Sequence, residues 1–366
     1  TLLSNEALTA DESATESEIL MIGEGATRVE EASDGTEVTL IVRSTPFHAE
    51  GGGQLGDTGY IVGPMGKMEV TTTRKLPEGT TYHVGVISEG TLHVGDAVTF
   101  EVDTERRMSM ARNHTATHLL HAALKQVLGN HVNQAGSLVM PDRLRFDFTH
   151  FSPVTAEELQ QVTDLVNAEI LKAQDVAIAE MSMPEAKELG AMALFGEKYG
   201  DRVRVVTVPD FSIELCGGSH VPNAAVIGQF RIVSEGGIGS GVRRIEAVTG
   251  AAALVMAQHD HAELMALATA LKTKPEGLQA RVAQLQEELK TAEHELAAAK
   301  KELAAGSMQD VLASKFDVNG LSGVVATVAA SDMEELRGIA DMVRDHIGSG
   351  VVLLGMASDD KVNFVC

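Results

Sequence analysis

The sequence predicts an α+β protein with several domains, and two changes of pattern along the chain carry this prediction. Residues 24–105 hold short β-branched runs separated by Gly, Pro and Asp, which is typical of antiparallel strands joined by tight turns. From Arg106 apolar residues recur at offsets of three and four, the spacing of a helix, and strand-like runs then return up to residue 250. A chain of 366 residues is long enough to form more than one buried core.

The predicted segments follow one another in a simple order. Residues 1–23 are expected to be a linker from a missing upstream part, and residues 24–105 form a small antiparallel β-barrel. Residues 106–250 form an α+β domain, because helices alternate there with half-buried strands. The first of its helices is expected to end at Gly129, and the second to begin after Thr155, whose spacing to Glu158 fits a capping box.

The last third of the chain changes character twice. Residues 251–305 are rich in Ala, Leu, Glu and Gln and predict a helical connector, broken once at KTKPEG. Apolar residues repeat there every seven positions, at Val282, Leu289, Leu296 and Leu303. This seam fits either a coiled coil, within the chain or between chains, or an amphipathic helix on the surface of its own domain. Residues 306–366 read as the beginning of a β-α-β unit, which indicates a piece of a longer protein.

Composition excludes several classes of protein. The net charge of −23 argues against a protein that coats nucleic acid through a basic surface, although a local site remains compatible with it. No apolar run of 18 residues occurs, so no membrane helix is predicted, and the acidic N-terminal segment is unlike a signal peptide. Cys216 and Cys366 are too few for a disulfide framework, which favours a reducing, cytoplasmic location.

The strongest chemical signal is a pair of short motifs that together predict a zinc site. His114 and His118 lie four positions apart on a predicted helix and therefore share one face. Cys216 and His220 enclose two glycines that follow a predicted strand, and a tight turn there could direct both side chains to the same point. One Cys and three His are a suitable tetrahedral ligand set for Zn²⁺.

The role of this zinc is open from ligand count alone. Four protein ligands are typical of a closed structural site, whereas a catalytic zinc keeps one position for water or substrate. Uncharged polar residues near the motifs nevertheless favour a reaction site, since they can orient an ester or a water molecule. These residues are Thr115, Thr117, Asn133 and Gln134.

Other catalytic and phosphate-binding signatures are weak or missing. The sequence holds no GxSxG motif, no Walker A motif and no apparent Ser-His-Asp arrangement. The loop AEGGGQLGDTG, residues 49–59, is interpreted as a β-turn that needs no ligand, although nucleic acid could approach it closely. Arg243 and Arg244 follow a Gly/Ser loop and face opposite ways on a strand. One is expected to contact phosphate and the other to pair with an acid such as Glu246.

Six motifs in order resemble the editing half of the bacterial alanyl-tRNA synthetase family: FHAEGGGQLGDTG, HTATHLLHAAL, VNQAGSLV, LRFDFTH, CGGSHV and SGVRRIEAVTG. The resemblance implies the β-barrel, a zinc-dependent editing domain over 106–250 of the type shared with threonyl-tRNA synthetase, and the helical connector. It also implies that residues 306–366 are a truncated C-terminal DHHA1-type domain, so that its expected contact with the tRNA elbow is incomplete.

The resemblance further implies a function. The parent enzyme uses ATP to attach alanine to tRNA(Ala), and this segment hydrolyses tRNA(Ala) mischarged with serine or glycine, without an aminoacylation core of its own. The family's zinc ligands fall on the same four residues, its pocket residues on Thr117 and Gln134, and its contacts with the tRNA acceptor end on Arg243 or Arg244. His48 and Gly51 stand where relatives often have tyrosine and serine, and they receive no role. No membrane partner is implied, and the full-length parent is expected to dimerise.

The expected mechanism is hydrolysis of an ester by water. Zinc and Thr117 hold the seryl group, Gln134 orients the reactants, and either Glu214 or a hydroxyl of the tRNA takes the proton. Two other interpretations remain: a free-standing alanyl-tRNA editing protein, and a tRNA-binding module with a structural zinc. The heptad connector and the unfinished β-α-β unit favour the synthetase over the first, and the polar residues near the metal favour an enzyme over the second.

Overall fold

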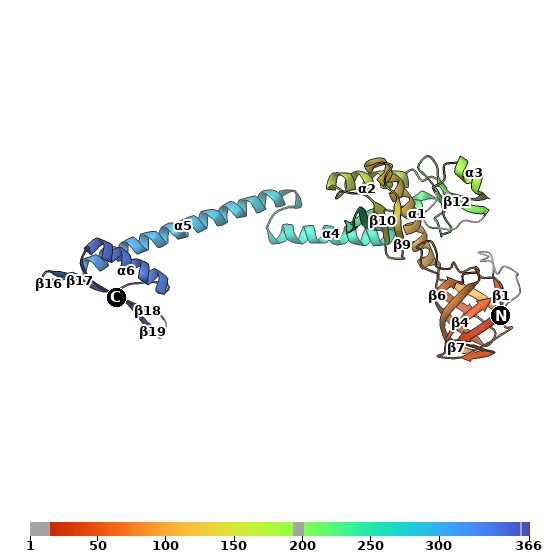
Figure 1. The fold of residues 1–366 in the computed structure, drawn as a ribbon, viewed down its shortest axis with the longest axis horizontal. Helices are drawn as coiled ribbons and strands as arrows, with labels where there is room; N and C mark the ends of the chain where they lie inside the picture. The colour runs from red at the N-terminus through yellow and green to blue at the C-terminus, as the bar shows by residue number, and fades with distance from the viewer. Residues whose placement is uncertain (1–14, 193–200, 359–360) are drawn as a thin grey trace. The chain divides into compact units, whose positions relative to one another are not determined.

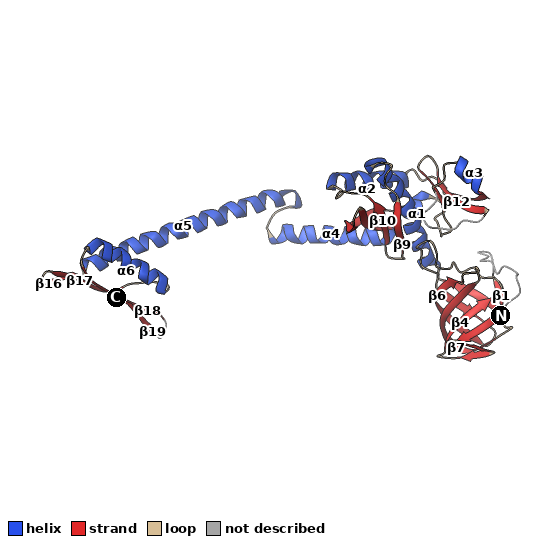
Figure 2. Cartoon of the chain, viewed as in Figure 1, coloured by secondary structure: helices blue, strands red, loops and turns tan. Residues whose placement is uncertain are grey.

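A computed structural model describes residues 15–192, 201–358 and 361–366, without the side chains of residues 301, 303–307 and 358. It divides the chain into two compact units, Thr1–Asp260 and His261–Cys366, each of which is described by itself. Both units combine helices and strands, in agreement with the predicted multidomain α+β class (Figures 1 and 2).

The first domain of unit 1 is a closed antiparallel β-barrel, as predicted. Its six strands pair in the order β1-β4-β7-β6-β5-β8, and β8 pairs back to β1. The short strands β2 (Thr27–Val29) and β3 (Glu31–Ser33) pair with β1 and β7 respectively. The barrel strands are β1 (Glu16–Glu24), β4 (Glu37–Val42), β5 (Gly59–Val62), β6 (Gly66–Lys75), β7 (Thr81–His93) and β8 (Ala97–Val102).

The barrel begins earlier than the sequence analysis expected. Part of the predicted linker 1–23 is β1, whose residues pair with both β4 and β8, while residues 1–14 lie outside the described part. Ile19 and Ile22 are fully buried in the barrel core beside Leu40 and Phe47. The exposed acids at the start of the strand obscure this pattern, because they give the segment the composition of a solvated tail.

The second domain of unit 1 is built on α1 (Thr104–Leu128). Asp103 caps the helix by accepting from the Arg106 amide, and the helix ends at Gly129, as predicted. It packs against a four-stranded antiparallel sheet in the order β14-β15-β10-β9. The sheet strands are β9 (Gln134–Val139), β10 (Leu144–Thr149), β14 (Phe230–Gly239) and β15 (Val242–Thr249). Leu119, Phe146 and Phe148 are fully buried between helix and sheet.

Further elements complete this domain. The helix α2 (Ala156–Leu171) starts with the predicted capping box between Thr155 and Glu158 and packs on α1. A small antiparallel sheet follows, in the order β11-β12-β13. The sheet strands are β11 (Ala177–Ser182), β12 (Arg202–Val208) and β13 (Ser212–Leu215). A short helix, α3 (Met183–Glu188), lies between β11 and β12 in the chain, and a 3₁₀ turn, η1 (Ala224–Ile227), follows β13.

The glycine-rich loop joins the barrel to the second domain. The Gly53 carbonyl accepts a 2.7 Å bond from the Val139 amide, and the Leu55 amide donates to the Val139 carbonyl at 3.2 Å. Gly53 has φ +82°, and a Cβ placed on it would lie 2.4 Å from the Ser137 oxygen, so only glycine allows this close approach. The loop therefore does more than form the predicted β-turn: it packs along β9, and Gln54 lies between the two domains.

The connector consists of α4 (Gly250–Ala270), the 3₁₀ turn η2 (Pro275–Gly277) and α5 (Leu278–Ala313), with the break at the predicted place. The helix α5 continues past residue 305, the predicted end of the connector, because Gly306 does not interrupt it. Val282, Leu289 and Leu296 are exposed, and the Leu303 side chain lies outside the described part. The seam thus remains open to either interpretation.

Unit 2 ends in a small sheet in the order β16-β17-β18-β19. Strands β17 and β18 are parallel and joined by α6, as the predicted β-α-β unit requires. The elements are β16 (Lys315–Val318), β17 (Leu321–Thr327), α6 (Met333–Ile347), β18 (Gly350–Ser358) and β19 (Lys361–Val365). No helix in the described part of the chain is both long and apolar enough to span a bilayer.

Candidate metal centre

The structure brings the four predicted zinc ligands together inside unit 1. His114 and His118 lie one turn apart on α1, while Cys216 and His220 come from the turn after β13. One potential ligand atom from each residue lies within 4.8 Å of all the others. The Cys216 Sγ atom is 3.3 Å from His114 Nε2 and 3.2 Å from His220 Nε2. Zinc bond lengths give roughly 3.3–3.8 Å between ligand atoms of a tetrahedron, so this donor set fits Zn²⁺.

Gly218 allows the ligand turn to reach α1. A Cβ atom on Gly218 would lie 2.0 Å from Cε1 of His114, whereas a Cβ on Gly217 would meet nothing within 4 Å. The guanidinium of Arg204 donates to the carbonyls of Cys216 and Gly218 at 2.9 and 2.7 Å and so fixes the turn from the neighbouring strand. Position 218 therefore requires glycine, because a larger residue would clash with the His114 ring.

Two polar side chains hold the outer nitrogens of the ligand histidines. The Gln54 carboxamide oxygen lies 2.7 Å from His114 Nδ1 and also accepts from the Ser219 amide at 2.9 Å. Because a carboxamide oxygen only accepts, Nδ1 carries the proton and Nε2 faces the cluster with its lone pair. On the other side, Thr115 Oγ1 lies 3.1 Å from His220 Nδ1. Both contacts are typical of the outer shell of a metal site.

A buried carboxylate completes the surroundings. Glu214, 2% exposed, lies 3.0 Å from His121 Nδ1 and 3.6 Å from His118 Nε2. Burial opposes protonation of His118, but the charge of Glu214 and the bond to Cys216 raise its pKa to about 9. Burial also opposes ionisation of Glu214, yet His118 and His121 lower its pKa below the usual value.

The charge state of the cluster suits a metal cation. Burial would raise the pKa of the Cys216 thiol, but His114 and His118 hold that pKa well below its usual value. Burial together with His114 lowers the pKa of His220 to about 3, so this imidazole is neutral. The lowered pKa of Cys216 favours its thiolate, which is the form that binds a divalent metal cation.

The predicted catalytic residues occupy different surroundings. The Thr117 hydroxyl is buried and donates to the Asn113 carbonyl at 2.8 Å. Gln134 is half-buried at the start of β9, opposite Phe148. Within the described residues, neither side chain is hydrogen-bonded to a ligand of the cluster. Their catalytic roles stay predictions.

Both predicted tRNA-binding arginines are engaged in ion pairs. Arg243 binds the Glu235 carboxylate through two nitrogens, at 2.6 and 2.8 Å. Arg244 binds Asp147 in the same way, at 2.7 and 2.8 Å. The expected partner Glu246 instead accepts from Ser234 at 3.4 Å. Asp147 on β10 lies directly opposite Arg244 on β15. A residue directly opposite on the neighbouring strand is closer than a residue two positions along the same strand, which is where Glu246 lies.

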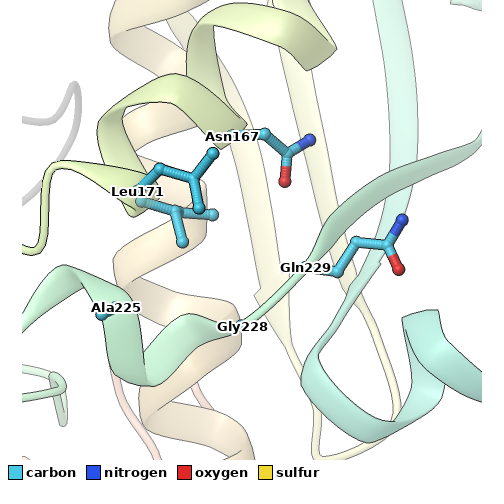
Figure 3. Close-up of a pocket in the computed structure, with 6 residues that line it drawn as sticks. Asn167, Leu171, Ala225, Gly228 and Gln229 are labelled. Carbon is cyan, nitrogen blue, oxygen red and sulfur yellow. The ribbon is translucent and has the colours of Figure 1, made fainter.

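A separate cavity of about 350 Å³ lies beside α2 and η1 (Figure 3). Its lining is uncharged: Asn167, Ile170, Leu171, Ala225, Gly228 and Gln229. The Asn167 amide is already satisfied by the backbone of Thr163 and Phe230. None of these side chains is a metal ligand or a nucleophile, so this cavity offers no alternative to the Cys/His cluster as a reaction site.

Two family models match the chain. A model of class II (A) tRNA synthetases matches residues 2–106, and a model of the threonyl and alanyl tRNA synthetase second additional domain matches residues 203–246. The second match contains Cys216 and His220. Fold and site thus define a class II tRNA synthetase segment that carries this additional domain.

Comparison with whole proteins narrows the family. The chain is 48% identical over 360 residues to the alanine–tRNA ligase of Acetivibrio thermocellus and 47% identical over 345 residues to that of Bacillus subtilis. These alignments cover 98% and 94% of this chain but only 41% and 39% of the two relatives. The chain therefore spans about two fifths of their length. The resemblance to the alanyl-tRNA synthetase family is confirmed, and the chain corresponds to part of such an enzyme.

Proposed function

We propose that this chain is the editing part of an alanine–tRNA ligase and that it hydrolyses seryl- and glycyl-tRNA(Ala) in a zinc-dependent reaction. The observation that carries the proposal is the buried Cys/His cluster, whose ligand atoms lie within 4.8 Å of one another. It lies in a chain that aligns along 98% of its length with an alanine–tRNA ligase. Attachment of alanine, which uses ATP, is assigned to the aminoacylation core of the parent enzyme.

An alanine-specific ligase has a physical need for such a site. A pocket that accepts alanine cannot strongly reject serine, because an added hydroxyl is discriminated by only about 10²-fold in a comparable case. Glycine is smaller than alanine and enters the same pocket. A second site that hydrolyses the wrong ester restores the accuracy that binding alone does not supply.

The residues divide the chemistry between them. His114, His118, Cys216 and His220 would hold Zn²⁺, which when bound supplies a positive charge to position the ester or polarise its carbonyl. The Thr117 hydroxyl donates to the Asn113 carbonyl, so its oxygen remains able to accept from the ammonium or hydroxyl group of the substrate. The Gln134 amide orients the attacking water.

The reaction balances as a simple hydrolysis. The water oxygen forms a bond to the ester carbonyl carbon, the bond from that carbon to the ribose oxygen breaks, and the ribose oxygen takes a proton. Glu214 is already bound between two histidines, so we do not assign it as the base. Instead, the neighbouring ribose hydroxyl of the tRNA carries a proton from the attacking water to the leaving ribose oxygen. The products are the free amino acid and uncharged tRNA(Ala).

A second candidate function follows from the ligand count. Four protein ligands leave no open position in a tetrahedral zinc site, which is typical of structural zinc. On that basis the chain would be a tRNA-binding module without hydrolytic activity. The enzyme remains the first candidate because the family resemblance assigns pocket roles to Thr117 and Gln134, which a structural-zinc module does not need.

One experiment separates the two candidates. The purified chain is incubated with seryl-tRNA(Ala) and with alanyl-tRNA(Ala), before and after zinc removal, and both binding and hydrolysis are measured. An editing enzyme hydrolyses the seryl ester selectively, loses this activity without zinc and recovers it when zinc is returned. Gln134→Ala should then abolish hydrolysis without weakening binding, whereas the matched surface variant Gln160→Ala should change neither. Binding without hydrolysis in the zinc-loaded chain would support the structural-zinc module.

A further inference from the structure

Three histidines share one stripe of α1, and two of them belong to the metal cluster. His114, His118 and His121 lie at positions i, i+4 and i+7 of the helix, and all three are buried. His114 and His118 are members of the Cys/His cluster, whereas His121 is not among its residues. The proposed chemistry therefore leaves one buried histidine on the same face of the helix without a role.

The chain offers a matching pair of side chains opposite this stripe. Glu214 on β13 and Cys216 just after it are two positions apart, so both point to the same side, toward α1. The Cys216 Sγ atom lies 3.3 Å from His114 Nε2, and further along the helix the Glu214 Oε1 atom lies 3.0 Å from His121 Nδ1. The other oxygen of Glu214, Oε2, lies 3.6 Å from His118 Nε2. Each oxygen of this carboxylate thus faces a different histidine, and one of the two is a proposed metal ligand.

His121 anchors this carboxylate to the core of the domain. An ionised carboxylate only accepts hydrogen bonds, so the His121 Nδ1 atom is the donor. The His121 ring packs against Phe146, with ring centres 5.2 Å apart, and Phe146 belongs to the core between helix and sheet. The position of Glu214 beside the cluster is therefore set by a residue that is itself no ligand.

A carboxylate buried this deeply needs a positive charge nearby. Glu214 is 2% exposed, and an ionised carboxylate in the interior is costly unless it is paired with an opposite charge. A hydrogen bond from a neutral His121 ring satisfies one oxygen but supplies no net charge. Bound Zn²⁺ would supply it, because the Cys216 thiolate cancels just one of its two charges and histidine ligands are neutral.

We propose that Glu214 is a positioning residue of the metal site, which holds the ring of His118 and offsets the charge of the bound cation without being a ligand. The inference rests on the zinc dependence of the proposed function. The other two ligand histidines have direct hydrogen-bond partners in Gln54 and Thr115. Glu214 acts on the third over 3.6 Å, through its charge. The loss of such an outer partner typically weakens metal binding by 10- to 100-fold.

The test measures the dissociation constant for Zn²⁺ by competition with a chromophoric chelator, using the full chain. Glu214→Gln keeps the size of the side chain and an oxygen that can accept from His121, but it removes the charge. We expect the dissociation constant to rise about 10- to 100-fold and Glu214→Asp to recover part of the loss. Glu169→Gln is the matched control, since Glu169 is 5% exposed on α2 and bound to Lys172, and it should bind zinc like the unaltered chain.

Two further measurements distinguish this role from a purely structural one. Co²⁺ bound in place of Zn²⁺ has visible absorption bands that depend on the number and type of its ligands, and these bands should keep their positions in Glu214→Gln. His121→Leu should also weaken zinc binding. The double variant with Glu214→Gln should then bind no more weakly than Glu214→Gln alone, because His121 acts through Glu214.

The outcomes are distinct for this inference and for the proposed function. Unchanged zinc affinity in Glu214→Gln overturns the inference, as does an equal loss in Glu169→Gln. Shifted cobalt bands also overturn it, since they would make Glu214 a ligand. If Glu214→Gln does not fold, unchanged affinity in His121→Leu overturns it instead. The expected loss of affinity in a zinc-binding chain that hydrolyses no seryl-tRNA(Ala) supports the positioning role and overturns editing. An unaltered chain that binds no zinc overturns both.

Discussion

Gln54 of the glycine-rich loop and His114 of α1 are hydrogen-bonded at 2.7 Å across the junction of two domains. Gln54 is fully buried, and its amide nitrogen also donates to the Ser219 hydroxyl at 3.1 Å. The barrel therefore supplies the group that fixes the tautomer of one metal ligand and touches the turn that carries two others. This arrangement makes zinc affinity depend on a domain that contributes no ligand.

The first prediction concerns this contact. Gln54→Leu keeps a similar volume but leaves His114 Nδ1 without an acceptor, so we expect zinc affinity to fall about 10- to 100-fold. Competition with a chromophoric chelator measures the dissociation constant. Gln160→Leu, on the exposed face of α2, is the matched control and should bind zinc normally. An unchanged affinity in Gln54→Leu would show that the barrel does not support the metal site.

The second prediction compares the two glycines of the ligand turn. Gly218→Ala adds a Cβ atom that would lie 2.0 Å from Cε1 of His114, so the turn or the helix must shift. We expect zinc affinity to fall by at least about tenfold, because small displacements of a ligand spoil tetrahedral geometry. Gly217→Ala meets nothing within 4 Å and should bind zinc like the unaltered chain. Equal affinities for the two variants would contradict the packing described for Gly218.

These glycines and Gln54 show what the sequence could and could not predict. The pairing of His114 with His118 depends on helical spacing alone, and the capping box at Thr155 is equally local. Both are therefore readable from a single segment. The contact from Gln54 joins residues 60 positions apart, and nothing in the loop AEGGGQLGDTG indicates which distant helix it meets. The only signal in the loop is its run of three glycines, which indicates that another segment of backbone packs closely against it.

The arginine pairs illustrate a second limit. Arg243 and Arg244 were expected to face opposite ways, and they do bind different acids. The sequence suggested Glu246 for one of them because it is near in the chain, but strand register decides the partner. Asp147 on β10 stands directly opposite Arg244 on β15, and this register depends on the packing of the whole sheet.

The third prediction is a loss of barrel stability in acid. His83 is fully buried, with Nε2 2.8 Å from Thr45 Oγ1 and Nδ1 3.3 Å from the Leu40 carbonyl. Burial lowers its pKa from 6.5 to about 4, although the bond to Leu40 opposes this. Well above pH 6.5 the His83 ring is neutral in both the folded and the unfolded chain, so it adds no pH dependence to the free energy of unfolding. As the pH falls from 6.5 to 4 only the unfolded chain gains the proton, so stability falls by roughly 3 kcal/mol.

Urea unfolding followed by circular dichroism at pH 7.5, 5.5 and 4.5 measures this effect. His83→Gln removes the titrating ring and should flatten the dependence on pH. The control His294→Gln, on α5 outside the barrel, should retain the slope of the unaltered chain. The same slope in His83→Gln would assign the acid sensitivity to other groups.

The fourth prediction separates the two arginines. Arg244 is 34% exposed and uses Nε and Nη2 for Asp147, so its remaining guanidinium donors can still bind a phosphate. Arg243 is 16% exposed and its partner Glu235 only 7%, which favours a structural role. Arg244→Gln should therefore lower the slope of log binding constant against log salt for tRNA(Ala) by about 0.7–0.9, the contribution of one phosphate.

Arg243→Gln should act on stability instead. Its loss leaves the Glu235 carboxylate buried without a partner, and we expect the free energy of unfolding to fall by roughly 1–3 kcal/mol with an unchanged salt slope. Arg28→Gln, on the exposed strand β2, controls for the loss of one positive charge. Binding titrations at several salt concentrations and urea unfolding of the same variants give both quantities. A reduced salt slope in Arg243→Gln and not in Arg244→Gln would reverse the assignment, because the phosphate contact would then come from the more buried arginine.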